Sequence, residues 1–194
     1  IMLTGARSAK CYQYRMGVGT DLSKLRPRGC KVRNAAKTSS GAASFMEYFS
    51  TVCGAVGQQG RRGALMLTID VNHPDVEEFI LMKQEAAKVL NANVSVKISD
   101  AFMIAVQQDA EFKLEWGGKV YKTVRARSLW DKILNSAYKC AEPGVLFWDR
   151  VLERPHGFYP GASPVTTNPC SEIPLPDDDV CLLTSIYLPY FVKN

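Results

Sequence analysis

A nearly unbroken apolar run from Ala64 to Val71 constrains the fold of this chain more than any other feature. A short run of this kind, bounded by loops and without alternation of polar and apolar residues, is typical of a strand buried on both faces of a parallel sheet. The next residues, Asn72 to Asp75, predict a helix start with Pro74 at or near its first position. A fully buried strand that leads directly into a helix indicates an α/β fold.

The rest of the chain repeats this alternation of strands and helices. Apolar periodicity predicts further strands at 94–98, 145–148 and 182–188, and further helices at 6–15, 42–56 and 128–140, while 17–22 fits a short strand or a turn. Ser99 and Asp100 predict the start of another helix, and the pair Gly117-Gly118 predicts a small hairpin at 113–124. About five strands that alternate with helices favour a parallel sheet with the helices on its outside.

The composition is that of an ordinary soluble globular domain. Of 194 residues, 46% are hydrophobic and 22% are charged, and no apolar run is long enough to span a membrane. No signal peptide is recognisable, so we expect a cytoplasmic protein with reduced cysteines. The net charge of +5 suits phosphate-bearing ligands, but no nucleic-acid-binding module is recognisable, and nucleic acid is not expected as a partner. Both ends resemble cuts, and we expect an internal piece of a longer polypeptide.

The cysteines and histidines predict thiol chemistry rather than a metal site. The two histidines, His73 and His156, are isolated, and no cysteine spacing matches a zinc ligand set. Four of the six cysteines lie in no catalytic motif and are expected to be packing residues: Cys11, Cys30, Cys53 and Cys140.

The remaining two cysteines stand in and after a polar segment near the end of the chain. Asn168, Cys170 and Glu172 alternate along this segment, and Cys181 follows. In an extended segment, side chains two residues apart point to the same side, so an amide, a thiol and a carboxylate would face one substrate. A structural turn with a small buried cysteine explains the same residue types, and residue types alone do not exclude it.

The order of several short motifs decides between these interpretations. Those motifs lie at 17–27 (GVGTDLSKLRP), 38–46, 59–66, 73–83, 91–96, 142–149, 168–173 (NPCSEI) and 181–186 (CLLTSI). In this order they resemble the catalytic large subunit of ribonucleotide reductases over nearly the whole chain. The wording is most similar to the adenosylcobalamin-dependent class, and the iron-dependent class, which takes its radical from a partner protein, shares much of it.

The resemblance implies a fold and a reaction. Residues 1–194 would be a partial catalytic domain, truncated at both ends: the first half of a ten-stranded α/β barrel of parallel strands with outer helices, with the 168–172 loop projecting into its centre. Cys170 would be the thiyl radical that takes the 3′ hydrogen of a ribonucleotide, and Glu172 the base on its 3′-hydroxyl. Asn168 would hold the sugar hydroxyl by hydrogen bonds, and Ser171 would also bind the substrate. Cys181 would be one of the two thiols that supply electrons, although Leu182 and Leu183 replace the asparagine and glycine usual in the family.

The resemblance also implies ligands and partners. Arg33 and Lys37 lie in a basic loop that corresponds to the binding site of a nucleoside triphosphate effector, and residues 83–93 correspond to the loop that passes the effector's signal to the substrate. The implied cofactor is adenosylcobalamin, and the implied partners are a ribonucleoside diphosphate substrate, a thioredoxin-like reductant and a second copy of the chain. The first redox cysteine and the second half of the barrel would lie outside this segment, so the segment alone is expected to be catalytically silent. A non-catalytic nucleotide-binding module and a simple dithiol redox protein remain the alternatives from other classes.

Overall fold

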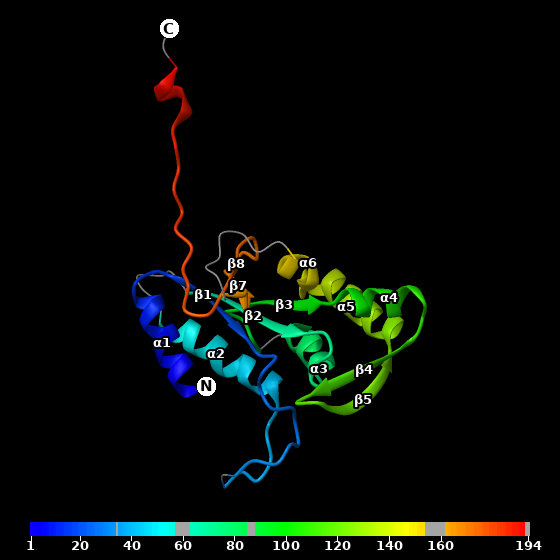
Figure 1. The fold of residues 1–194 in the computed structure, drawn as a ribbon. Helices are drawn as coiled ribbons and strands as arrows, with labels where there is room; N and C mark the ends of the chain where they lie inside the picture. The colour runs from blue at the N-terminus through cyan, green and yellow to red at the C-terminus, as the bar shows by residue number, and fades with distance from the viewer. Residues whose placement is uncertain (34, 57–62, 85–87, 154–161, 193–194) are drawn as a thin grey trace.

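The computed structural model describes residues 1–33, 35–56, 63–84, 88–153 and 162–192. At its centre lies a four-stranded sheet in the order β1-β2-β3-β6, and all three strand pairings are parallel (Figure 1). The sheet strands are β1 (Gly17–Asp21), β2 (Ala64–Asp70), β3 (Asn93–Ile98) and β6 (Gly144–Phe147). The predicted α/β class is therefore confirmed, and the described strands form an open sheet rather than a closed barrel.

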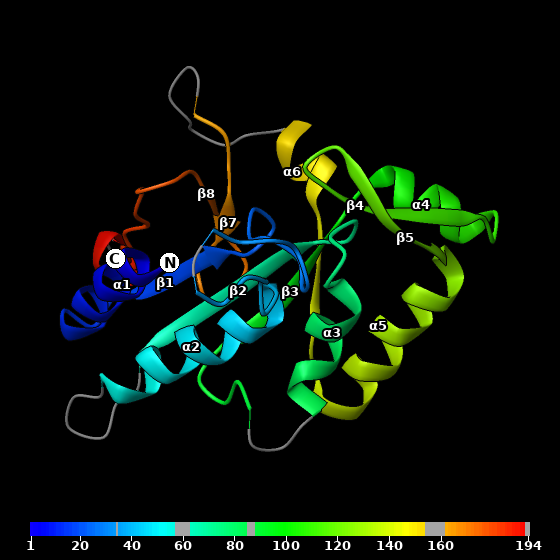
Figure 2. The ribbon, with the colours of Figure 1, turned by 90° about the horizontal axis from the view of Figure 1, so that it is seen from below.

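Helices connect the strands and lie along the sheet. They are α1 (Met2–Gln13), α2 (Ala42–Ala55), α3 (Val76–Leu81), α4 (Asp100–Gln107), α5 (Ala126–Cys140) and α6 (Trp148–Glu153), with short 3-10 turns η1 (Met82–Gln84) and η2 (Leu188–Phe191). Two antiparallel hairpins complete the fold: β4 (Glu111–Trp116) with β5 (Lys119–Arg125), and β7 (Thr166–Thr167) with β8 (Pro174–Leu175). Helices α1, α2 and α3 lie on one side of the sheet and the β7–β8 hairpin lies on the other (Figures 1 and 2).

The two faces of the sheet differ in chemistry because successive side chains of a strand point to opposite faces. On β2, Leu65, Leu67 and Ile69 belong to the hydrophobic core that the helices cover. Met66 and Thr68 point the other way; both are buried, yet neither belongs to that core. The strand register aligns glycines and polar residues on this second face: Gly17, Gly19, Asp21, Thr68, Asp70, Asn93, Ser95 and Lys97.

Several local signals in the sequence act as predicted. Ser99 is the N-cap of α4, and its hydroxyl accepts a hydrogen bond from the Phe102 amide at 3.1 Å. Gly117 and Gly118 both have positive φ, which the tight turn between β4 and β5 requires.

Two predictions about secondary structure are wrong. Helix α3 begins at Val76 rather than around Pro74, because the carboxylate of Asp75 is turned away from its own helix and accepts hydrogen bonds from the amides of Arg28 and Ala42. This carboxylate thereby caps α2 instead.

The second wrong prediction is the strand at 182–188, which is absent: residues 181–187 have no regular structure, and η2 follows. A strand needs a hydrogen-bonding neighbour, and among the described residues none is available to this segment, whose Leu182 and Leu183 are more than 80% exposed.

Candidate active site

The β7–β8 hairpin carries the Asn168–Glu172 segment and presents it over the polar face of the sheet. The hairpin is closed by the Val165 amide bonded to the Leu175 carbonyl at 2.8 Å and the Asn168 amide bonded to the Ile173 carbonyl at 3.1 Å. Its tip is a turn, with Ser171 at a φ of +73°. The prediction of an extended segment is therefore wrong, because the left-handed backbone at Ser171 reverses the chain within five residues.

The turn brings the predicted amide and carboxylate together. The Asn168 Nδ2 donates to Glu172 Oε1 at 2.7 Å, and the Asn168 Oδ1 accepts from the Ile173 amide at 3.1 Å. Both ends of the Asn168 side chain are thus held, and the Glu172 carboxylate is fixed beside it. Cys170 lies between them in sequence, and its side chain is exposed at the tip of the turn. Ser171 lies in the same turn, and its amide donates to the Asn168 carbonyl at 3.0 Å.

Two glycines of β1 let the hairpin approach the sheet closely. A Cβ atom at Gly19 would lie 2.0 Å from the Thr167 carbonyl oxygen, and one at Gly17 would lie 2.5 Å from the Pro169 ring. On β3, the Asn93 side chain donates to the Pro169 carbonyl at 2.9 Å. The early glycine-rich strand and the late NPC segment, almost 150 residues apart in sequence, therefore form one unit.

On the polar face of the sheet, beneath the hairpin, lies an ion cluster that the sequence analysis did not predict. The Lys97 ammonium lies 2.9 Å from Asp21 Oδ1 and 3.0 Å from Asp70 Oδ1, and the side chains of Lys97 and Asp21 are both only 6% exposed. The indole of Trp148 lies 4.9 Å from the same ammonium. The polar positions of β3 were the available signal, because Ser95 and Lys97 alternate with Val94 and Val96.

The other predicted residues lie apart from the hairpin tip. Cys181 is half-buried on the segment that follows β8, and in the described part of the chain it forms no disulfide or hydrogen bond with Cys170. Arg33 and Lys37 are exposed in the loop before α2, which a 2.8 Å hydrogen bond from the Val32 amide to the Lys37 carbonyl closes into a tight turn.

The segment at 83–93, which the resemblance predicts to pass the effector's signal, is held at its base by Lys83. The Lys83 ammonium binds the carbonyls of Val89 and Ala92 and forms an ion pair with Glu142 at 2.7 Å. Residues 59–62 of one motif, and His156, lie outside the described part of the chain.

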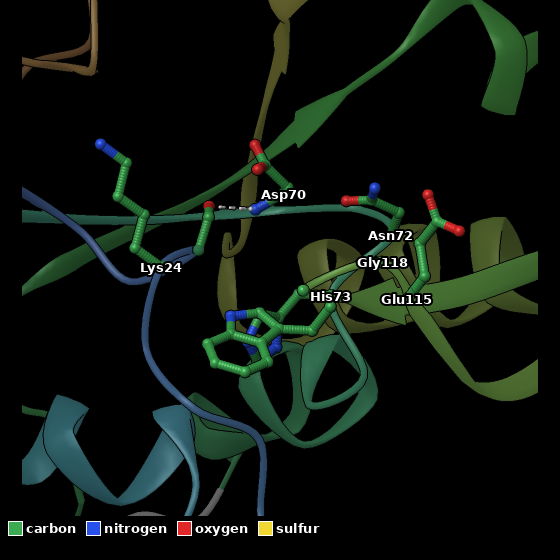
Figure 3. A pocket seen from close by; sticks show the side chains of 9 residues that line it. Lys24, Asp70, Asn72, His73, Glu115 and Gly118 are labelled. Atoms are coloured by element: carbon green, nitrogen blue, oxygen red, sulfur yellow. Dashed lines mark hydrogen bonds between the residues drawn. The ribbon is translucent and has the colours of Figure 1, made fainter.

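A pocket of about 360 Å³ opens beside the end of β2 (Figure 3). It is lined by the loop after β1, the start of the β2–α3 connection and the β4–β5 turn, and it includes Lys24, Asp70, Asn72, Glu115 and Trp116. A second pocket of about 530 Å³ lies next to it, lined by Lys97, Trp148 and residues of β4. Neither pocket is lined by a residue of the 168–172 turn.

Two buried groups away from the hairpin tip, His73 and Cys53, have structural roles. His73 is buried, with Nδ1 accepting from the Asp75 amide at 3.0 Å, so Nε2 donates to the Leu25 carbonyl at 2.9 Å. Burial raises the pKa of the Cys53 thiol, which agrees with its predicted packing role. All six cysteines are free. In the part of the chain that the structure describes, no helix has the length and apolar character that a membrane span needs.

Comparison with known proteins gives the family. The family model described as "Ribonucleotide reductase, barrel domain" matches residues 1–194. The chain is 38% identical over 182 residues to the vitamin B12-dependent ribonucleoside-diphosphate reductase of Thermoplasma acidophilum, covering 92% of this chain and 24% of that protein. It is 35% identical over 193 residues to the protein of the same name in Mycobacterium tuberculosis (strain CDC 1551), covering 97% of this chain and 28% of that protein.

A third relative is the vitamin B12-dependent ribonucleotide reductase of Rhodopirellula baltica, which is 32% identical and spans all of this chain, again over only 21% of the relative's length. The chain thus spans about a quarter of the length of these curated relatives. The family model and the Rhodopirellula baltica relative cover the whole chain, including the NPC hairpin and the glycine-rich strand of the candidate site. The chain belongs to the ribonucleotide reductase family, as a segment of its barrel domain.

Proposed function

We propose that this chain is the part of an adenosylcobalamin-dependent ribonucleotide reductase that carries the radical-bearing cysteine, and that the complete protein reduces ribonucleoside diphosphates to deoxyribonucleotides. The observation that carries the proposal is the geometry of the hairpin tip. The Asn168 amide donates a 2.7 Å hydrogen bond to the Glu172 carboxylate, and the exposed Cys170 thiol lies between them in sequence. All three lie on a hairpin that packs closely on the sheet because β1 has glycines at two contact positions.

Each side chain of the tip has a defined task in this reaction. The sulfur radical of Cys170 takes the hydrogen atom from C3′, which forms an S–H bond and leaves a carbon radical. Glu172 accepts the proton of the 3′-hydroxyl, which is within the ordinary reach of a positioned carboxylate. Asn168 orients Glu172 and donates hydrogen bonds to the sugar hydroxyls.

Two further thiols supply the electrons and protons that the reduction needs. The 2′-hydroxyl leaves as water, Cys181 and a second thiol supply two electrons and two protons, and they end as a disulfide. Cys170 then returns its hydrogen atom to C3′. The second thiol lies outside this segment in the proposed assignment. In sum, a ribonucleotide and a dithiol give a deoxyribonucleotide, a disulfide and water.

The proposed cobalamin dependence rests on the printed names of the relatives. The described residues do not themselves fit a corrin beside Cys170, because that thiol is exposed at the tip of a turn and neither pocket reaches it. We therefore assign the cofactor's contacts to the remaining length of the complete protein and route no step through them. Cobalamin dependence separates this proposal from an iron-dependent large subunit.

The other proposed partners follow the family assignment. Arg33 and Lys37 would bind the phosphates of a nucleoside triphosphate effector, since both are exposed cations on one tight loop. A thioredoxin-like protein would reduce the disulfide, and two copies of the protein would form a homodimer.

The test uses the complete polypeptide in which this segment is encoded, found by sequencing the DNA outward from both ends. With adenosylcobalamin and a dithiol, we expect turnover of a ribonucleoside diphosphate, no turnover for Cys170→Ser, and a loss of about 10²–10⁴-fold for Glu172→Gln.

Cys140→Ser is the matched control, because that thiol forms hydrogen bonds with the carbonyls of Ser136 and Glu142 and the hydroxyl of Ser136, and a serine oxygen can replace it. Turnover by Cys170→Ser would contradict the proposed mechanism. Nucleotide binding without any turnover by the unmodified protein would instead support the non-catalytic alternative.

A further inference from the structure

The ion cluster beneath the hairpin is joined to it by a chain of hydrogen bonds. Asp21 Oδ1 accepts from Thr68 Oγ1 at 3.0 Å, and Thr68 Oγ1 lies 3.0 Å from Thr166 Oγ1 on β7. A hydroxyl has one proton, and the carboxylate can only accept, so the Thr68 proton goes to Asp21. Thr166 therefore donates to Thr68, and the order of the chain is fixed from β7 down to the carboxylate.

Lys97 holds the far end of this chain in place. Its ammonium binds Asp21 and Asp70, and it also lies 3.5 Å from the carbonyl of Val165, the residue immediately before β7. One buried cation therefore neutralises the carboxylate that anchors Thr166 and faces the backbone that leads into the hairpin. Replacing a buried ion pair by apolar residues of the same volume is often neutral or stabilising, so fold stability alone gives no reason for this pair.

From this arrangement we propose that Lys97 is a positioning residue for the active site: acting through Asp21, Thr68 and Thr166, it sets the height and register of the β7–β8 hairpin over the sheet. This hydrogen-bonded chain then sets where the hairpin tip, with Asn168, Cys170 and Glu172, lies relative to the sugar. The inference rests on the proposed function of those three residues. Lys97 itself touches none of them.

The hairpin is the right kind of element for such an anchor. Its two strands have only two residues each, so its own ladder is too short to fix it. It packs against glycines of β1, which allow a close approach but have no side chains that could fix the position of the hairpin. Among the described residues, the directional contacts between hairpin and sheet include the hydrogen bonds from Thr166 to Thr68, from Asn93 to Pro169 and from Lys97 to the Val165 carbonyl.

Two isosteric variants on neighbouring residues give the sharpest test. Thr166→Val removes the hydroxyl that links the hairpin to the anchor, whereas Thr167→Val removes a buried hydroxyl that has no hydrogen-bond partner among the described residues. In the complete polypeptide, amide hydrogen exchange across 165–175 should become about tenfold faster in Thr166→Val and should not change in Thr167→Val. Exchange in α5, on the opposite side of the core, should not change in either variant.

Lys97 is tested together with its partner, because Lys97→Met alone leaves Asp21 buried without a cation. The double variant Asp21→Asn/Lys97→Met removes the two buried charges and leaves Asp70, whose side chain is 42% exposed and can be solvated without a cation. We expect faster exchange confined to 165–175, a fall in kcat of about a hundredfold, and a KM for the nucleotide that stays within about twofold, since misplacement of the reacting groups affects the chemical step.

Equal acceleration of exchange in the hairpin and in α5 would show a purely structural role and overturn the proposal, as would unchanged exchange in the hairpin. The exchange measurement does not need turnover. If the complete protein reduces no ribonucleotide, the proposed function fails while the anchoring of the hairpin is still decided. Normal kcat in the double variant, with a loosened hairpin, would likewise overturn the positioning role but leave the proposed reaction intact.

Discussion

Replacing Gly19 by alanine tests whether the close approach of hairpin and sheet sets the active-site geometry. The new Cβ would lie 2.0 Å from the carbonyl oxygen of Thr167 and 2.9 Å from the Cγ2 of Thr166. The first of these atoms belongs to the backbone, so no rotamer change relieves the clash. To reach an ordinary contact of 3.4 Å, β7 must retreat by about 1.4 Å.

The size of this retreat sets the expected effects. Overpacking of this kind costs about 1–3 kcal/mol of unfolding free energy. The same movement takes Thr166 out of hydrogen-bonding reach of Thr68, now 3.0 Å away, which adds about 1 kcal/mol. A misplacement of the reacting groups by about 1 Å lowers turnover by about a hundredfold. A hundredfold fall in turnover corresponds to about 2.7 kcal/mol of activation free energy, so turnover and stability should both fall measurably.

The assay compares urea unfolding and kcat of the complete polypeptide with those of Gly144→Ala. A Cβ at Gly144, also on the polar face, meets only the hydroxyl of Ser95 within 3 Å, and that side chain can rotate away. The control should keep both stability and turnover. A Gly19→Ala protein with unchanged stability and unchanged exchange in the hairpin would refute the reasoning, because the hairpin could not then lie where the structure places it.

Two further predictions concern the scaffold. Burial alone would raise the pKa of Glu77, but hydrogen bonds and ion pairs with Lys122 and Lys132 lower it, so its stabilising effect is present above the ordinary glutamate pKa of about 4.3 and is lost as the pH falls through the lower folded value. Urea unfolding at several pH values should show this loss, and Glu77→Gln should flatten it; an equal acid dependence in both proteins would contradict it. Ser99→Ala removes the cap on the Phe102 amide and should lower the unfolding free energy by about 1 kcal/mol, whereas no change would show that the cap is dispensable.

Local signals in the sequence predicted the elements whose causes are local. The apolar run at 64–71 became β2, Ser99 became an N-cap, and the glycine pair made the β4–β5 turn. The start of α3 was missed because its cause is distant: Asp75 is used by amides more than 30 residues earlier in the chain. No pattern within residues 72–78 carries that information.

The candidate site shows the same division. The resemblance supplied Asn168, Cys170 and Glu172, and the structure adds the contact between the first and the last. The prediction of an extended segment failed because one positive φ angle at Ser171, a residue without special preference for it, turns the chain. Periodicity could predict that Lys97 lies on the face of β3 opposite the core. It could not predict that a hairpin 70 residues later would bury that face.

Two neighbouring residues of β3, Val96 and Lys97, separate the stability of the core from the positioning of the hairpin. Val96 is buried in the apolar core under the helices, and shortening it would cost about 1–3 kcal/mol for the two methyl groups lost. Lys97 points to the other face, where small and polar residues hold the hairpin by directional bonds. Apolar packing tolerates sliding, whereas a hydrogen bond weakens steeply with distance and angle. A site that must place a thiol against one carbon atom therefore gains from polar contacts beneath it, even though apolar packing of the same volume is often as stable or more stable.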